Sequence, residues 1–179
     1  SFEPTFYALE RLKKNLSLNE SIAKNVTVIN SFVSEKSSDN PNIVAFSSWK
    51  VNGERGTNDH PVHLGTPKAA DGVPAISLDD FTEINKIEKI DFIKIDTDGH
   101  EYEVFKGAKK AIAKYRPKII FEIGLYVMDE KNISFDFYYN YFKDLNYKLF
   151  DTKTDKEITL ENYAKHIPKN GSTDLIAIP

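Results

Sequence analysis

The sequence contains no cysteine, and this absence removes several kinds of chemistry together. Such a chain forms no disulfide bond, offers no thiolate to a metal ion and has no cysteine nucleophile. It suits a reducing compartment, so we expect a cytoplasmic protein. Long apolar runs are lacking as well: residues 119–128, the longest candidate, are interrupted by Glu122 and fall short of the roughly 18–20 residues that cross a bilayer. The sequence therefore predicts no membrane-spanning segment.

An excess of charge of one sign is also missing. The 24 Lys and Arg residues nearly balance the 27 Asp and Glu residues, and acidic residues are interspersed among the lysines. This balance argues against nucleic acid or an anionic membrane as the main partner. With 40% hydrophobic residues the chain has enough apolar surface to fold, and its length is typical of a single domain over residues 1–179.

Segments with the spacing of strands and of helices alternate along most of the sequence. We expect helices at residues 5–16, 78–85, 101–115 and 135–145, and strands at residues 25–33, 43–49, 90–96, 118–124, 147–150 and 174–178. This alternation favours an α/β fold with a doubly wound, mostly parallel sheet. The aromatic residues of 135–145 have helical spacing, so we assign them to the core. Residues 50–74, with four glycines and three prolines, are expected to form a long lid or binding loop.

Polar residues mark the carboxyl ends of the predicted strands, where open α/β sheets bind ligands. These candidates are Glu3, Ser34, Glu35, Asp96, Asp98 and Glu122. A carboxylate has two acceptor oxygens that match a vicinal diol, so Glu3 is placed to bind both hydroxyls of a ribose. Glu122 interrupts an apolar strand, where a carboxylate needs a partner or a function. His60, in the long loop, is a candidate general base because a neutral imidazole accepts a proton near pH 7.

The candidates also have purely structural interpretations. Glu3 precedes Pro4 at a predicted helix start, where a negative charge is favourable next to the helix dipole. Asp98 belongs to an Asp-Gly pair, which is common in turns, and an aspartate there also caps a helix. His60 in a loop is ordinarily only solvated. The residue types alone allow both interpretations.

Five short blocks follow one another along the chain. They are Phe2-Glu3-Pro4, Leu78-Asp79-Asp80, Ile93 to Glu101, Gly107-Ala108, and Pro117 with Phe121-Glu122-Ile123. In this order they resemble the FkbM-type S-adenosylmethionine-dependent methyltransferases, nearly from end to end. The most specific block is Lys-Ile-Asp-x-Asp-Gly-x-Glu, in which Asp98 stands where the family more often has glutamate.

The resemblance implies a Rossmann-like sheet of the class I methyltransferase type, with an antiparallel strand at its C-terminal edge. It also implies S-adenosylmethionine as the cofactor, with Glu3 on the ribose hydroxyls and Asp96 near the methionine end. The implied reaction is O-methylation of a hydroxyl of a small molecule or sugar. Ser34 and Glu35, at the next strand end, complete the expected cofactor site.

One part of the family pattern is absent. The glycine-rich turn after the family's first strand lies against the methionine part of the cofactor, yet no Gly-x-Gly occurs anywhere in this sequence. We therefore expect an N-terminally truncated domain that lacks its first strand and binds the cofactor poorly or not at all. The missing strand would be a central one, so its loss would leave unpaired edges. An upstream segment would have to supply that edge, or a second copy would, as a homo-oligomer.

For the chemical step, the candidates are Asp96, Glu122 and His60. Asp96 and Glu122, at neighbouring strand ends, would hold the acceptor hydroxyl or share a divalent cation that lowers its pKa, and we assign no metal site. Two other classes stay open. One is an inactive methyltransferase-like domain that serves as an interaction module. The other is a phosphatase of the haloacid-dehalogenase type, which fits Asp96 as a nucleophile but needs a further acidic pair where this chain has Glu122 alone.

Overall fold

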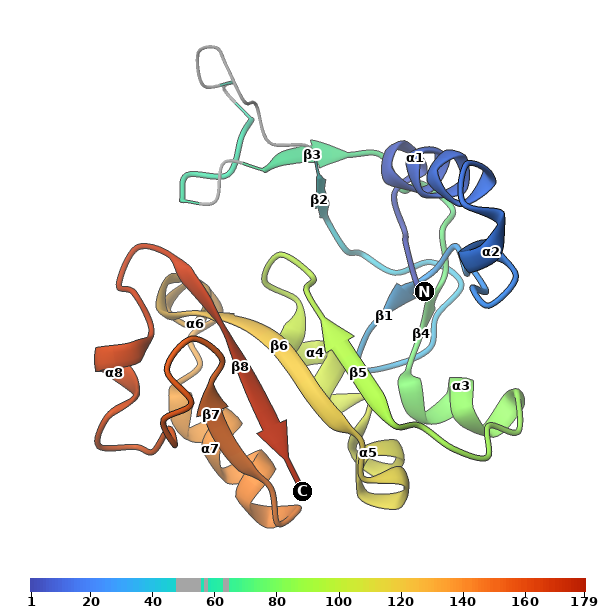
Figure 1. Ribbon diagram of the computed structural model, residues 1–179. Helices are drawn as coiled ribbons and strands as arrows, with labels where there is room; N and C mark the ends of the chain where they lie inside the picture. Colours follow the sequence, from blue (N-terminus) through green and yellow to red (C-terminus); the bar gives the residue numbers. More distant parts are fainter. Residues whose placement is uncertain (48–55, 57, 63–64) are drawn as a thin grey trace. The chain divides into compact units, whose positions relative to one another are not determined.

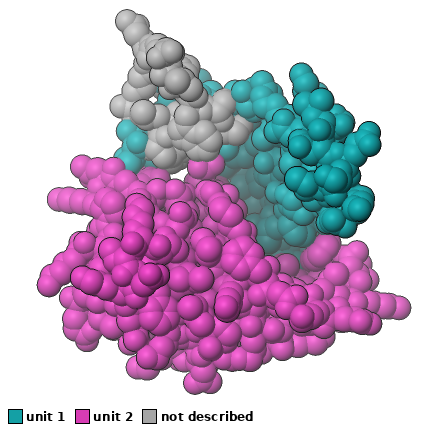
Figure 2. All heavy atoms as spheres, viewed as in Figure 1, with its two compact units in different colours: residues 1–77 teal, residues 78–179 magenta. Residues whose placement is uncertain are grey.

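The computed structural model describes residues 1–47, 56, 58–62 and 65–179 (Figure 1). The chain divides into two compact units, residues 1–77 and 78–179, and each is described by itself (Figure 2). The expectation of one domain over residues 1–179 stays a prediction. No helix in the described ranges is long and apolar enough to cross a membrane.

Unit 1, in its described part, consists of short helices and two strand pairs. Its elements are α1 (Phe6–Ser17), α2 (Glu20–Ala23), β1 (Phe32–Val33), β2 (Ala45–Ser47), β3 (Thr66–Lys68) and β4 (Ala75–Ile76). β1 and β4 pair in parallel, whereas β2 and β3 pair antiparallel. An isolated parallel bridge joins Phe2 to Ile29. The buried cluster of this unit consists of Phe32, Ala45, Val73 and Ala75.

The helix predicted at residues 5–16 is confirmed as α1. It begins at Thr5, whose hydroxyl accepts a hydrogen bond from the backbone N–H of Ala8 and so caps the helix. The strand predicted at residues 25–33 is wrong for most of its length, because β1 is confined to Phe32–Val33. β-branched residues favour an extended chain but do not provide the partner that a strand needs.

The predicted strand and loop that follow are each confirmed only in part. Of the strand at residues 43–49, Ala45–Ser47 are confirmed as β2, and its last two residues lie outside the described ones. The predicted loop at residues 50–74 is wrong for Thr66–Lys68, which form β3 and pair with β2. β3 contains Pro67, which is tolerated because a two-stranded pair leaves an open edge that needs no N–H donor.

Unit 2 is built on a four-stranded sheet with the strand order β5-β6-β8-β7 (Figure 1). Its elements are α3 (Leu78–Ile84), β5 (Phe92–Ile95), α4 (Glu101–Lys106), α5 (Lys109–Tyr115), β6 (Lys118–Gly124), α6 (Leu125–Lys131), α7 (Phe135–Asp144), β7 (Lys148–Asp151), α8 (Tyr163–His166) and β8 (Ser172–Ile178). β5 and β6 are parallel, and β8 runs antiparallel to both β6 and β7. The antiparallel strand expected at the edge therefore lies one strand further in, with β7 outside it.

Aromatic side chains fill the space between this sheet and helices α4 and α7. The ring of Phe105 in α4 meets that of Phe121 in β6 edge to face at 5.0 Å, and Phe142 in α7 stacks on Phe121 at 5.3 Å. All three side chains are fully buried. The prediction that the aromatic residues of 135–145 belong to the core is confirmed for Phe135, Tyr138, Tyr141 and Phe142.

The helix predicted at residues 101–115 is interrupted at Gly107 and Ala108, between α4 and α5. Asp79 in α3 bonds to backbone groups at this break. Its N–H donates to Gly107 O at 2.9 Å, and its Oδ1 accepts from the N–H of Ala111 at 2.7 Å. The side chain thus satisfies a free N–H at the start of α5, which makes a second helix start possible there.

Candidate active site

The carboxyl ends of β5 and β6 bring Asp96 and Glu122 to neighbouring positions. Ile95, the last residue of β5, pairs with Phe121 of β6, so the two acidic residues follow at the same level on adjacent parallel strands. The side chain of Asp96 is half exposed and forms an ion pair with Lys94 Nζ. Two predicted site residues therefore share one edge of the sheet.

Glu122 lies among other acidic residues. Burial raises the pKa of its carboxyl, and the negative charges of Asp96, Glu101 and Asp174 raise it further, whereas a hydrogen bond from Ser172 acts in the opposite direction. That bond runs from Ser172 Oγ to Glu122 Oε1 and measures 2.5 Å. Asp174 is the cross-strand neighbour of Glu122 in the β6–β8 pair. A carboxylate with a raised pKa is a stronger proton acceptor in its ionised form.

A second buried carboxylate holds the turn that follows β5. Glu101 is 3% exposed, and its Oε1 accepts hydrogen bonds from the N–H and the Oγ–H of Thr97, each at 2.8 Å. The turn passes through positive φ at Asp98 (51°) and Gly99 (101°). Burial raises the pKa of Glu101, and hydrogen bonds from backbone N–H groups oppose this. The N-cap position of α4 is His100, two residues after Asp98. The capping and the binding interpretation of Asp98 both stay predictions.

Tyr126 covers the end of β6. Its ring lies against Gly124, where an added Cβ would be 2.7 Å from Tyr126 Cε1, so a larger residue does not fit. Burial raises the pKa of Tyr126 to about 12, and the negative charge of Glu122 adds to the shift. The phenol therefore keeps its proton at neutral pH.

In unit 1, Glu3 is held at both its backbone and its side chain. Its N–H donates to Ile29 O at 3.0 Å, and Asn30 Nδ2 donates to Glu3 O at 2.8 Å. Its Oε1 accepts from the N–H and the Oγ–H of Thr5, both at 2.7 Å. Among the described residues, none bonds to Oε2. The structural and the binding interpretation of Glu3 thus concern different oxygens of one carboxylate.

The other predicted residues of unit 1 lie in local backbone networks. Ser34 follows β1, and its N–H donates to the backbone of β4. Glu35, next in the chain, is half-buried. His60 donates its N–H to Gly65 O at 2.9 Å, and its Nδ1 accepts from the N–H of Val62 at 3.2 Å. One ring nitrogen of His60 is thus engaged within its own segment, and the roles of these three residues stay predictions.

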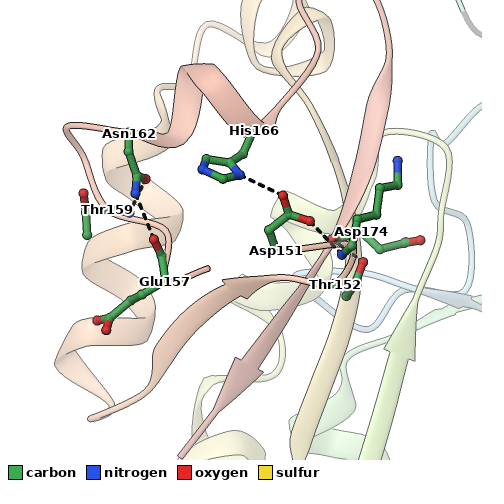
Figure 3. Close-up of polar contacts among 8 residues, drawn as sticks. Asp151, Thr152, Glu157, Thr159, Asn162, His166 and Asp174 are labelled. Atoms are coloured by element: carbon green, nitrogen blue, oxygen red, sulfur yellow. Dashed lines mark hydrogen bonds and ion pairs between the residues drawn. The ribbon is translucent and has the colours of Figure 1, made fainter. Parts of the chain in front are cut away.

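A histidine and an aspartate that the sequence pattern did not single out meet at the end of β7 (Figure 3). Asp151 is 4% exposed, and its Oδ2 lies 2.7 Å from Nδ1 of His166 in α8. Its Oδ1 accepts from the N–H of Lys153 at 2.8 Å. The bond to His166 is the main cause that lowers the pKa of Asp151 to about 2, so Asp151 is the ionised acceptor at neutral pH. Nothing in the spacing of residues 151 and 166 signals the pair.

Metal ligation has limited support in the geometry. Over the parts of the chain that the structure describes, no group of three or more His, Cys, Asp or Glu side chains could hold a metal ion. From the sequence, a divalent cation shared by Asp96 and Glu122 is only an alternative and no metal site is assigned, and these two side chains alone would have to bind it.

Comparisons with known proteins agree on one family. A family model described as a methyltransferase FkbM domain matches residues 1–149. A solved structure, the methyltransferase FkbM from Methylobacillus flagellatus KT, matches with a TM-score of 0.52 and 20% identity over 98% of this chain. This chain covers 35% of that protein, about a third of its length, and the likeness shows the fold alone. No curated protein gave a significant match. With 149 of its 179 residues matched by the family model, the chain belongs to the FkbM methyltransferase family.

Proposed function

We propose that this protein is an S-adenosylmethionine-dependent methyltransferase that methylates a hydroxyl of a small molecule or sugar. The observation that carries the proposal is Glu3, a carboxylate fixed in place with one oxygen open to a ligand. Ribose hydroxyls donate hydrogen bonds to such an oxygen, so this residue fits the cofactor. Ser34 and Glu35 belong to the same proposed cofactor site. Membership of the family supports the reaction class.

When bound, the cofactor supplies a methyl group on a positively charged sulfur. Glu122 would accept the proton of the acceptor hydroxyl, because its raised pKa makes it a better base than an ordinary glutamate. Ser172 holds Oε1 of Glu122 and so leaves Oε2 for that hydroxyl. Asp96 would orient the acceptor from the neighbouring strand end, and His60 is a second candidate base. The acidic residues around Glu122 also favour a positively charged ligand.

The fold that we propose is the Rossmann-like, doubly wound sheet of the class I methyltransferase type. Two observations support it. β5 and β6 are parallel and joined by a helical crossover through α4 and α5. β8 is antiparallel and lies between β6 and β7. A cytoplasmic location and a partner that is not nucleic acid stay predictions from composition.

Titration with S-adenosylhomocysteine, followed by two-dimensional amide NMR spectra, tests the proposal. This readout detects weak binding, with dissociation constants in the millimolar range, for which the binding free energy is only about −4 kcal/mol. We expect the amide signals next to Glu3 to shift on titration, and Glu3→Ala to weaken binding by about tenfold or more. Glu10→Ala, which removes an exposed carboxylate of α1, is the matched control and should bind as the wild type does.

Absence of any shift up to millimolar ligand, both in this chain and in a form extended at its N-terminus, would overturn the cofactor assignment. The inactive interaction module would then be the better description. Equal binding by Glu3→Ala and the wild type would show that the cofactor binds without this carboxylate, and Glu3 would lose its proposed role.

A further inference from the structure

A cavity of about 360 Å³ opens in unit 2 between α7, the first residues of β7 and residues 157–158. Leu149, which lines it, is paired through β8 to the level of Ile119 at the beginning of β6. Glu122 lies three residues further along β6. A strand rises about 3.3 Å per residue, so roughly 10 Å separate the two levels. The cavity is therefore distinct from the sheet edge that carries Glu122, and no residue proposed for cofactor or acceptor binding lines it.

The floor of the cavity, formed by Tyr147, Leu149 and Ile158, is apolar and held in place. Leu149 and Ile158 are 3% and 1% exposed, and the N–H of Ile158 donates to Leu149 O at 2.8 Å. The side chain of Tyr147 is also buried, and its hydroxyl is already engaged, because it donates to Pro117 O at 2.8 Å. A floor of this kind binds an apolar or aromatic group by removing its surface from water.

The wall of the cavity, formed by Tyr139, Lys143 and Asn146, carries polar groups without a hydrogen-bond or ion-pair partner in the described parts of the chain. These groups are the hydroxyl of Tyr139, Nζ of Lys143 and the side-chain amide of Asn146. Lys143 Nζ lies 5.8 Å from the centre of the Tyr139 ring. The backbone carbonyl of Asn146 accepts a hydrogen bond from Arg116, which holds the turn that carries the amide. Hydrogen-bond donors thus lie next to an apolar floor.

The charges that line the cavity favour a ligand with a single negative charge. Two lysines and one glutamate line it, so its formal charge is +1. Lys148 Nζ and Glu157 Oε2 form an ion pair at 3.1 Å, and their charges offset each other. Lys143 is therefore the uncompensated cation. A monoanion balances this charge, whereas the carboxylate of Glu157 disfavours a dianion such as phosphate.

We propose that this cavity is a binding site for a small aromatic carboxylate. The ring of the ligand lies on the apolar floor, next to the ring of Tyr139, and the carboxylate accepts hydrogen bonds from Lys143 and Asn146. This site combines an apolar surface with a few convergent polar groups, as ligand sites in proteins commonly do. The inference does not depend on the proposed function, because none of the residues involved takes part in methyl transfer.

Amide NMR titrations of the wild-type chain with three probes test the class of ligand. Benzoate has both the ring and the carboxylate, benzyl alcohol has the ring without the charge, and acetate has the charge without the ring. We expect benzoate to shift the amide signals of residues 146–149 and of Ile158, and to bind at least about tenfold more tightly than either other probe. Equal binding of benzoate and acetate, or shifts spread over the chain without saturation, would contradict the proposal.

Variants with altered charge test the role of Lys143. Lys143→Gln removes the uncompensated cation and should weaken benzoate binding about fivefold to tenfold, while benzyl alcohol should bind as to the wild type. Glu157→Gln removes the acid and should tighten benzoate binding about twofold to fivefold. Lys109→Gln, which removes an exposed lysine of α5 outside the cavity, is the matched control. Equal losses in Lys143→Gln and Lys109→Gln would show that overall charge, and not the cavity, attracts benzoate.

Asn146→Gly tests the amide of the wall. Asn146 has a φ of 57°, which glycine adopts without strain, so this variant keeps the turn and loses only the side chain. We expect it to bind benzoate about threefold more weakly than the wild type. If Lys143→Gln and Asn146→Gly keep the wild-type amide spectrum and both bind benzoate as the wild type does, the carboxylate does not bind at this wall and the proposal is wrong.

Discussion

The hydroxyl of Ser172 donates a hydrogen bond to Oε1 of Glu122 across the antiparallel pair β6–β8, between residues 50 positions apart in the sequence. This bond lowers the pKa of Glu122, while burial and the neighbouring acids raise it. The protonation of a candidate catalytic carboxylate thus depends on a residue near the C-terminal end of the chain.

Replacement of Ser172 tests this dependence directly. Ser172→Ala removes the hydrogen bond that stabilises the ionised carboxylate, so we expect the pKa of Glu122 to rise above its value in the wild type. Ser172→Thr keeps a hydroxyl and should leave that pKa closer to the wild-type value. The carboxyl ¹³C chemical shift of Glu122, followed against pH, measures its pKa in both variants. An unchanged pKa in Ser172→Ala would show that the bond does not form in solution.

The pH dependence of stability should also report on Glu122. Its pKa is raised in the folded state above the ordinary glutamate value of 4.5, so the folded chain holds this proton more tightly than the unfolded chain does. That stabilisation is present below pH 4.5 and is lost as the pH rises through the folded-state pKa. Glu122→Gln cannot lose a proton, and it should gain stability relative to the wild type over that range. Urea unfolding at several pH values measures the difference, and parallel profiles would contradict the prediction.

The contribution of Asp151 to stability should depend on pH in the opposite direction. Its pKa is lowered to about 2 in the folded state from 3.8, mainly by the bond to His166. The stabilisation is therefore present above pH 3.8 and is lost as the pH falls through about 2. We expect His166→Gln to have a lower free energy of unfolding than the wild type at pH 5. This difference should become smaller as the pH falls toward 2. Lys165→Gln, an exposed neighbour in α8, is the control and should show no such narrowing.

Asp79 connects α3 to the start of α5, and its loss should be measurable. Asp79→Ala leaves the N–H of Ala111 without its acceptor, and we expect a loss of about 1 kcal/mol of unfolding free energy, as for other helix caps. Asp79→Asn keeps an acceptor oxygen and should lose less. Glu83→Ala, an exposed acidic residue of the same helix, is the matched control. Equal stability of Asp79→Ala and Glu83→Ala would mean that Asp79 is not the cap.

Two phenylalanines of unit 2 should differ strongly in how much they stabilise the fold. Phe105 is fully buried against Phe121 and Phe142, so Phe105→Ala should lower the unfolding free energy by about 3–5 kcal/mol. Phe92 is 53% exposed in β5, and Phe92→Ala should cost less than about 1 kcal/mol. Chemical denaturation of both variants measures the contrast, and similar losses would show that the core is packed differently.

Local patterns predicted much of this fold. The helices at residues 5–16, 78–85 and 135–145 and the strands at 90–96, 118–124, 147–150 and 174–178 all exist, with ends shifted by no more than two residues. Helices satisfy their own backbone hydrogen bonds, so spacing and a cap such as Thr5 are sufficient to locate them. The long strand β6 was equally clear, because its apolar run is bounded by Pro117 and Gly124.

Other elements depended on contacts between distant residues. The run at residues 25–33 is rich in β-branched residues, yet little of it forms a strand, because a strand exists only where a partner strand lies beside it. The helix break at Gly107 depends on Asp79 from another helix. The helices α2, α6 and α8 are short, and the pattern did not indicate them.

The properties of the candidate site also divide into those that the sequence predicts and those that depend on folding. The sequence by itself determined which residues are candidates for the chemistry, since Glu3, Asp96 and Glu122 stand at the ends of predicted strands, where open α/β sheets bind ligands. Only the tertiary structure decided their states: Thr5 occupies one oxygen of Glu3, and Ser172 and the surrounding acids act on Glu122. The physical reason is that residue type and local spacing set what a side chain can do, whereas its protonation and free lone pairs depend on neighbours that folding brings together.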